Sequence, residues 1–280
     1  MSKTFLVTGV SSGLGAAIAR RALAAGHRVA GTVRTEADRV AFETGGARGY
    51  LLDVTEEDRI GPVVARVEAD LGPIDVLVVN AGYGHEGTFE ESSMADLRRQ
   101  FEVNVFGAVA TMKAVLPGMR ERRSGSILVI TSMGGMTTFP GVSFYHGSKY
   151  ALEGIVDSLA QEVAGFGVHV TAVAPGGFRT EWAGRSMVRA GRSVPDYDEV
   201  FEPVRARRAA NSGHQVGDPD KAGDAILALV AAAKPPVHVL LGSDALRLVA
   251  AGRQRVRDDL DAWSELSRST DHADGGRTIG

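Results

Sequence analysis

The stretch TFLVTGVSSGLGAAIARRALA, residues 4–24, joins three local patterns that together decide the fold. Its first residues, Thr4 to Thr8, predict a short apolar strand. Glycine and serine dominate the next segment. Leu14, Ile18 and Ala22 then recur every four residues, which predicts a helix. Strand, glycine-rich turn and helix in this order are typical of an α/β fold.

Three glycines punctuate the turn, at Gly9, Gly13 and Gly15. Residues without a Cβ let the backbone approach a diphosphate closely, and the amides at the start of the following helix carry partial positive charge. The spacing is G-x3-G-x-G rather than the common G-x-G-x-x-G fingerprint. The turn therefore predicts a dinucleotide site, and a tight turn without a ligand is the alternative.

The same turn matches a second motif, because residues 9–13 also fit the G-x-S-x-G elbow of serine hydrolases. Such an elbow follows earlier strands that build the sheet and the oxyanion loop, whereas only one strand precedes Ser11. We therefore reject the hydrolase interpretation.

Further apolar segments continue the alternation of strands and helices along the chain. Strands are expected at residues 27–33, 49–52, 75–79, 125–132, 168–174 and 237–241, and helices at 56–71, 93–122 and 219–232. After Asp75, the strand expected at 75–79 is continuously apolar, as in a strand that is buried on both faces of a parallel sheet. No linker divides the pattern, so we expect one α/β domain over residues 1–243.

The stretch from Ile130 to Glu162 contains a phenol and an ammonium at helical spacing. Tyr145 precedes Lys149 by four residues, where apolar residues begin to recur with the period of a helix, so both side chains share one face. A nearby positive charge lowers the pKa of a phenol, as a proton donor near neutral pH requires. The alternative is a pair of surface residues that happen to lie one turn apart.

The second expected strand ends in Val33-Arg34-Thr35. A site that prefers NAD usually has a carboxylate near this point, which accepts the ribose hydroxyls and repels a 2′-phosphate. An arginine can instead pair with that phosphate through its planar fork. We therefore expect NADP(H) to be preferred, with NAD(H) possible if Arg34 faces solvent.

Polar positions also follow the third and fourth strands and interrupt a helix. Asp53-Val54 could hold the adenine edge, although Asp53 could instead cap the next helix. The small residues of Asn80-Ala81-Gly82 would let a cofactor pass over the end of a strand. Asn104 falls inside the helix expected at 93–122, whose first residues resemble a capping box, and taken alone it would point to solvent.

Composition limits the class of protein. Of the 280 residues 44% are hydrophobic and 23% are charged, and the net charge is -3, which argues against a nucleic-acid or anionic-membrane partner. The arginine clusters at 120–123 and 205–208 are therefore expected to be solvated helix faces. No cysteine is present, the seven histidines lack metal-ligand spacing, and the N-terminal apolar run is too short for a signal peptide. We expect a cytoplasmic protein without a metal site.

The C-terminal third breaks the regular alternation. Residues 178–215 form a long, arginine-rich insertion directly after a strand, and we expect it to be a substrate lid. Apolar residues at steps of three and four predict a further helix over 244–266. The polar segment 267–280 is expected to be disordered.

These motifs occur in one order that resembles the short-chain dehydrogenase/reductase family over about residues 3–243. The resemblance rests on TGVSSGLG at 8–15, Asp53-Val54, Asn80-Ala81-Gly82, Asn104, Ser132, Tyr145-x3-Lys149 and PGGFRT at 175–180. It implies a single-domain, Rossmann-like, doubly wound parallel sheet of about seven strands in the order 3-2-1-4-5-6-7, with the active site at the carboxyl ends of the strands.

The resemblance also implies roles for individual residues. Tyr145 would be the general acid and base, Ser132 would hold the substrate carbonyl, and Lys149 would hold the nicotinamide ribose and lower the pKa of the phenol. Asn104 would bind the water of a proton relay. The implied cofactor contacts are Gly9, Ser11, Ser12, Gly13, Leu14, Gly15, Arg34, Asp53, Val54, Asn80, Ala81, Gly82, Tyr145, Lys149, Pro175, Gly176, Phe178 and Thr180.

The implied activity is NADP(H)-dependent hydride transfer between a ketone or aldehyde and the corresponding alcohol. Met133, Phe139, Phe178 and Trp182 would line the substrate side, which favours an apolar or aromatic substrate. A non-catalytic dinucleotide sensor or scaffold on the same fold is the alternative. Family members commonly pair helices between subunits, so a homodimer or homotetramer is expected. His146, where a smaller residue is usual, would face the substrate or a neighbouring subunit.

Overall fold

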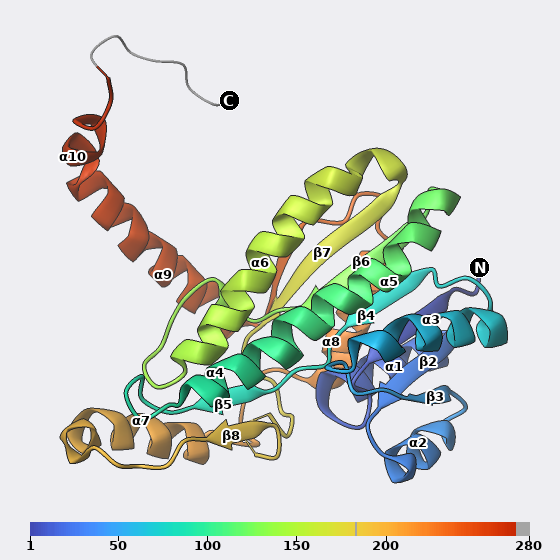
Figure 1. Cartoon of the computed structure of the whole chain (residues 1–280), viewed down its shortest axis with the longest axis horizontal. Coiled ribbons are helices and arrows are strands. Elements are labelled where there is room, and N and C mark those ends of the chain that lie inside the picture. The colour runs from blue at the N-terminus through green and yellow to red at the C-terminus, as the bar shows by residue number, and fades with distance from the viewer. Residues whose placement is uncertain (183, 273–280) are drawn as a thin grey trace.

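Seven parallel strands form the centre of the molecule in the computed structural model, which describes residues 1–182 and 184–272. Their order is β3-β2-β1-β4-β6-β7-β9 (Figure 1). The strands are β1 (Thr4–Thr8), β2 (Arg28–Val33), β3 (Arg48–Leu51), β4 (Val76–Val79), β6 (Gly125–Ile130), β7 (Val168–Pro175) and β9 (His238–Leu241). The two labels missing from this order belong to a separate small sheet, so the predicted order 3-2-1-4-5-6-7 is confirmed.

Helices cover both faces of the sheet because successive residues of its central strands point to opposite sides. In β1, Leu6 belongs to one core cluster, which it shares with three of these helices, whereas Phe5 and Val7 belong to a second cluster, which they share with the other two. The first three are α3 (Glu57–Leu71), α5 (Gly107–Arg122) and α6 (Ser143–Val163), and the other two are α1 (Gly13–Ala24) and α8 (Pro219–Ala231). The doubly wound arrangement therefore follows from strands that are apolar on both faces.

The helix expected at 93–122 begins as predicted but is divided. In the capping box, the Ser93 hydroxyl accepts the Asp96 amide and the Asp96 carboxylate accepts the Ser93 amide. The three parts are α4 (Met94–Phe101), a π-helical turn (Glu102–Phe106) and α5. The π-helical turn contains Asn104, and such turns frequently occur at functional sites.

The insertion at 178–215 contains regular structure that the sequence pattern did not indicate. Its elements are β8 (Met187–Arg189), a short 3-10 turn (Pro195–Tyr197) and α7 (Asp198–Ala210). β8 pairs in parallel with β5 (Gly84–Glu86), which follows β4 in the chain. Figure 1 shows β8 and α7 together near the start of α6. Ala183 lies outside the described residues.

The C-terminal helix expected over 244–266 is found as two consecutive helices. They are α9 (Ser243–Ala262) and α10 (Ser264–Arg268). The buried residues of α9, which include Ala245 and Val249, lie in its first half, and the rest projects away from the body (Figure 1). Ser267 is helical, contrary to the disorder expected from this residue onward, and residues 273–280 lie outside the described residues. None of the described helices is both long and apolar enough to cross a membrane.

Candidate active site

A cavity of about 450 Å³ opens where the carboxyl ends of β1, β2, β3, β4, β6 and β7 meet. This is the edge at which open parallel sheets bind their ligands. Most residues expected at the site line it: Gly9, Ser11, Ser12, Gly13, Leu14, Arg34, Asp53, Val54, Asn80, Ala81, Gly82, Ser132, Met133, Tyr145, Lys149, Pro175, Gly176, Thr180 and Trp182. Four expected residues do not line it: Gly15, Asn104, Phe139 and Phe178.

The glycine-rich turn has a backbone conformation and a packing that only glycine accommodates easily at three positions. Gly9 and Gly13 have φ angles of 71° and 62°, a region that side chains disfavour. Gly15 has no room for a Cβ, which would collide with the Gly9 carbonyl oxygen and the Asn80 side chain, so it permits close packing. Ser12 precedes α1 without capping it through its side chain. The amides of the first helical turn are thus left to bind a negatively charged group.

Arg34 and Asp53 line the part of the cavity next to β2 and β3. Burial opposes ionisation of Asp53, but hydrogen bonds from Thr55 and the charges of Arg34 and Arg99 lower its pKa overall. The Asp53 carboxylate accepts the Thr55 amide at 3.0 Å and the Thr55 hydroxyl at 2.8 Å. It therefore closes a turn of its own, and Glu56 occupies the capping position of α3.

Sequence reasoning missed four charged residues of the lining, which are Asp38, Arg99, Glu181 and Arg185. Asp38 lies in the first turn of α2 (Glu36–Glu43) and accepts the Thr35 hydroxyl at 2.7 Å. Its position shortly after the β2 strand end was the one available signal. The other three lie on α4 and on the insertion, and reach the cavity only in the folded chain.

Ser132, Tyr145 and Lys149 share one wall of the cavity and are 8%, 8% and 6% exposed. The Ser132 hydroxyl lies near enough to the phenol to act on its pKa, and it accepts the Gly134 amide at 2.9 Å. Lys149 Nζ donates to the Ile130 carbonyl at 2.8 Å and lies 5.9 Å from the centre of the Tyr145 ring. The end of β6 and the first turns of α6 therefore bring a hydroxyl, a phenol and an ammonium together.

Burial dominates the acid–base character of this group. It raises the pKa of Tyr145 to about 12, although the hydrogen bond with Ser132 acts in the opposite direction. Burial also lowers the pKa of Lys149 to about 8, against the charge of Glu153. The lowered phenol pKa expected from the four-residue spacing is therefore wrong for this geometry, because desolvation of the buried phenol is the largest influence on its pKa. The phenol keeps its proton at neutral pH.

Asn104 is 1% exposed, so the solvent-facing position expected for it in isolation is wrong. Its side-chain oxygen accepts the Tyr83 amide at 3.0 Å. Its side-chain nitrogen donates to the Tyr83 carbonyl at 3.0 Å and to the Ser148 hydroxyl at 3.1 Å. These bonds tie the π-helical turn to the segment after β4 and to α6.

Trp182 forms an apolar wall beside the phenol. Its ring centre lies 5.3 Å from that of Tyr145, and the two planes are inclined by 58°. It also packs on Gly84, since a Cβ there would lie 2.9 Å from the indole and 2.9 Å from the Met187 methyl group. The expected residue Phe178 packs instead over Gly217, away from this wall.

His146 is 4% exposed and does not line the cavity. Its Nε2 accepts the Phe139 amide at 2.8 Å, so the ring proton sits on Nδ1, which donates to the Gly134 carbonyl at 2.7 Å. The ring thus closes the loop that follows Ser132. The expectation that His146 faces the substrate or a neighbouring subunit is wrong, and Phe139 packs on this ring with centres 5.7 Å apart.

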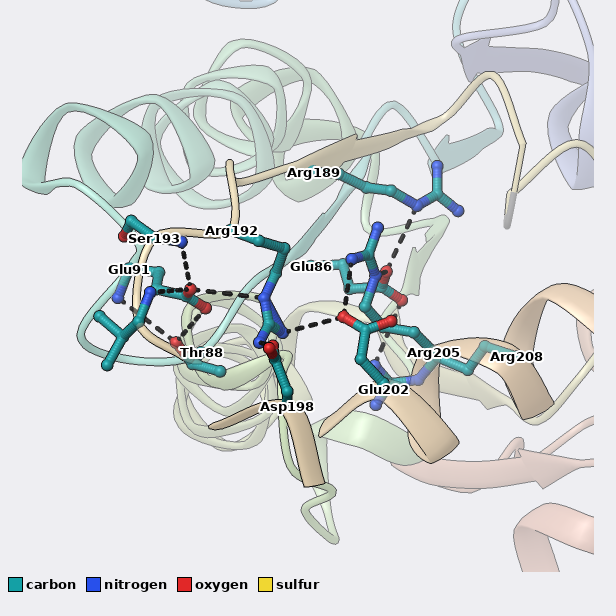
Figure 2. A network of polar contacts seen from close by, with 11 residues as sticks. Glu86, Thr88, Glu91, Arg189, Arg192, Ser193, Asp198, Glu202, Arg205 and Arg208 are labelled. Atoms are coloured by element: carbon teal, nitrogen blue, oxygen red, sulfur yellow. Dashed lines mark hydrogen bonds and ion pairs between the residues drawn. The ribbon is translucent and has the colours of Figure 1, made fainter. Parts of the chain in front are cut away.

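The arginine cluster at 205–208 is more than the solvated helix face expected from composition. Arg205 and Arg208 both lie against the buried carboxylate of Glu86, as Figure 2 shows. The expectation is wrong for these two arginines because their partner lies on β5, about 120 residues earlier in the chain. The described residues contain no cluster of three or more His, Asp or Glu side chains arranged to hold a metal.

Comparison with known proteins agrees with this geometry. Residues 3–188 match the family model of the short chain dehydrogenases. The chain is 35% identical over 275 residues to the oxidoreductase BOA17 of Botryotinia fuckeliana, covering 95% of this chain and 98% of that protein. A short-chain dehydrogenase from Streptomyces avermitilis superposes with a TM-score of 0.90 at 42% identity, covering 96% of this chain and 98% of the other. ElxO with NADP bound superposes with a TM-score of 0.71 at 25% identity, covering 86% and 96%.

The family match spans more than half of the chain, and the relatives extend it to nearly the full length. The glycine-rich turn and the buried side chains of Ser132, Tyr145 and Lys149 line one cavity. The chain therefore belongs to the short-chain dehydrogenase family and is an oxidoreductase of CH–OH groups that binds a nicotinamide dinucleotide.

Proposed function

We propose that the protein transfers hydride reversibly between NADP(H) and a ketone or aldehyde, with Asn104, Ser132, Tyr145 and Lys149 as its tetrad. The observation that carries the proposal is the buried group of Ser132, Tyr145 and Lys149 in the same cavity as the glycine-rich turn. A site for two phosphates and a proton donor thus share one space.

The chemistry divides between the dinucleotide and the residues of the chain. A bound nicotinamide dinucleotide supplies the hydride in reduction and accepts it in oxidation. The hydroxyls of Ser132 and Tyr145 hold the substrate oxygen, and the phenol donates its proton as negative charge develops there. Lys149 donates one of its three N–H groups to the Ile130 carbonyl, and the other two are available to ribose hydroxyls. Its charge stabilises the phenolate that remains.

Tyr145→Phe tests this mechanism, because it removes the proton donor and keeps the ring that packs on Trp182. We expect turnover to fall by about 10²- to 10⁴-fold, the usual contribution of a positioned acid, while NADPH still binds. The assay follows NADPH absorbance with a panel of ketones and aldehydes, with NADH as control. Near-normal turnover in the variant would contradict the mechanism. A wild-type protein that binds NADPH and reduces no carbonyl would instead be a sensor or scaffold.

The preference for NADP(H) is part of the proposal and rests on Arg34. This arginine lines the cavity at the end of β2, where its charge and fork suit a 2′-phosphate. Arg34→Asp should reverse the ratio of kcat/KM for NADPH and NADH, because a carboxylate accepts ribose hydroxyls and repels the phosphate. Arg48→Asp is the control, since this exposed residue on the neighbouring strand changes the charge equally and does not line the cavity. An unchanged ratio in Arg34→Asp removes this residue from the phosphate site.

We further infer an apolar or aromatic substrate, because Met133, Trp182 and Val188 line the cavity. A homodimer or homotetramer is also part of the proposal. Between α5 and α6 lies an open surface groove of about 600 Å³, lined by apolar residues that include Val109, Leu116 and Ile155. Burial of such a groove against a second copy would remove that surface from water.

A further inference from the structure

Glu86 is a buried carboxylate that the proposed mechanism does not use. Its side chain is 4% exposed and lies on β5. The carboxylate pairs with Arg189 at 3.3 Å, with Arg205 at 3.5 Å and with Arg208 at 3.3 Å. Figure 2 shows the three guanidinium groups, from β8 and α7, gathered around this one carboxylate. Such a centre joins parts of the chain that are far apart in sequence.

Arg208 links this centre to a third segment through its second arm. One terminal nitrogen contacts Glu86, and the other donates to the Pro140 carbonyl at 2.6 Å. Pro140 belongs to the loop after β6, and the next residue, Gly141, packs so tightly on Phe201 of α7 that a Cβ would collide with the ring. One guanidinium fork therefore joins the segments that follow β4, β6 and β7.

The contact with the active site runs along the small parallel sheet. Gly84 pairs with Met187, and the Gly84 amide donates to the Ser186 carbonyl at 2.9 Å. At the other end of the ladder the Ala190 amide donates to the backbone carbonyl of Glu86 at 2.9 Å. Trp182 packs on Gly84 and reaches the phenol, so the position of the indole depends on the β5–β8 pair.

We propose that Glu86 and Arg208 are positioning residues for the substrate. They lock three segments together and thereby fix Trp182 beside Tyr145, which sets the width of the space left for an apolar or aromatic ketone. The expected effect on kinetics rests on the proposed carbonyl reduction, whereas the effect on the indole does not.

A second buried carboxylate in the same network provides a matched control (Figure 2). The Glu91 side chain is 0% exposed and accepts the Ser193 amide at 2.7 Å, the Val194 amide at 3.0 Å and the Thr88 hydroxyl at 2.7 Å. Its fourth contact, with Arg192, is longer at 3.4 Å. The Ser193 and Val194 amides both donate to Oε1, which the oxygen of a glutamine can replace. The amide nitrogen that replaces Oε2 can donate to the Thr88 hydroxyl, which can also act as an acceptor. Glu91→Gln should therefore be far milder than Glu86→Gln, whose partners are all guanidinium groups.

The test uses the intrinsic fluorescence of the full chain. The protein has two tryptophans, so a Trp263→Phe background leaves Trp182 as the only tryptophan, and excitation at the long-wavelength edge of its absorption avoids emission from tyrosine. In this background Glu86→Gln should move the emission to longer wavelength and raise its quenching by acrylamide, because the indole is released into water. Glu91→Gln should leave both quantities near those of the background. The dissociation constant for NADPH should stay unchanged in both variants, since the glycine-rich turn is not part of the network.

Kinetics with the ketone that the wild type reduces best give the second readout. Glu86→Gln should lower kcat/KM by about 10- to 100-fold, mainly through a higher KM, because misplacement of a positioning group by about 1 Å can cost 10²-fold. If Glu86→Gln fails to fold, Arg208→Lys replaces it. That variant keeps a positive charge beside Glu86 and loses the fork that also reaches Pro140, so the same changes are expected in smaller degree.

Two results would overturn the inference. One is a folded Glu86→Gln or Arg208→Lys variant whose Trp182 emission and KM equal those of the background. The other is a Glu91→Gln variant that changes the Trp182 emission and the KM as much as Glu86→Gln does. A wild type that reduces no carbonyl, while Glu86→Gln still shifts the emission, would defeat the proposed function and leave the positioning role intact.

Discussion

His146 joins two backbone groups of the loop after Ser132 and can do so only as a neutral ring. Its Nε2 must be unprotonated to accept the Phe139 amide. Burial lowers the pKa of His146 below its ordinary value of 6.5, although the bonds with Gly134 and Phe139 oppose this. As the pH falls, His146 therefore gains a proton at a higher pH in the unfolded chain than in the folded one. This contribution to stability is full above pH 6.5 and is lost as the pH falls through the folded-state pKa.

The prediction is a steeper acid loss of stability in the wild type than in His146→Gln. Denaturant unfolding from pH 7.5 down to pH 5 should give a difference in slope of up to about 1.4 kcal/mol per pH unit below pH 6.5. His27 and His85 also have lowered pKa values, but they remain in both proteins and cancel in the comparison. The exposed His214→Gln is the control and should follow the wild type. Parallel slopes for wild type and His146→Gln would show that His146 does not titrate with folding.

Among the elements, α6 contributes Tyr145 and Lys149 to the cavity and Gly154 to the groove that it forms with α5. A Cβ built at Gly154 meets no atom within 4 Å, so the monomer has room for a large side chain there. The same position lines the groove between α5 and α6. Gly154→Trp should therefore lower the molar mass measured by size-exclusion chromatography with light scattering and leave monomer folding intact.

A matched substitution separates this effect from a general disturbance of α6. Gly165 also has no atom within 4 Å of an added Cβ, and it lies beyond the end of α6 and outside the groove. Gly165→Trp should keep the mass of the wild type. A wild type that is already monomeric, or a Gly154→Trp variant of unchanged mass, would mean that this face is not a subunit interface.

Local sequence pattern predicts the start of α4 but not the π-helical turn or the buried charge of β5. The capping box at Ser93 was visible because capping depends on residues three positions apart. The π-helical turn was not visible, because Asn104 is held there by Tyr83 and Ser148, which lie on other segments. β5 likewise contains a buried Glu86 that is tolerable only with arginines from the distant insertion.

Over the whole molecule, the order of motifs was enough to predict the sheet and much of the cavity lining. Asn80 and Ser132 directly follow strands, and the carboxyl ends of parallel strands meet at one edge, so their convergence followed from topology. Arg99 and Arg185 lie on a helix and an insertion whose placement depends on tertiary packing. The raised pKa of Tyr145 could not be predicted for a similar reason, since it comes from burial of the phenol in the folded chain.

A cavity lined from six strand ends predicts that NADPH stabilises the molecule as one unit. Its walls join residues from Gly9 to Val188, on both sides of the crossing between the two halves of the sheet. Ligand at 100 times its dissociation constant adds about 2.7 kcal/mol to the free energy of unfolding. In a chain of this size, that corresponds to a rise in Tm of about 5 to 10 °C. Differential scanning calorimetry should show a single transition that moves upward as a whole. A second transition whose temperature does not change with NADPH would mean that the insertion or the C-terminal helices unfold as a separate domain.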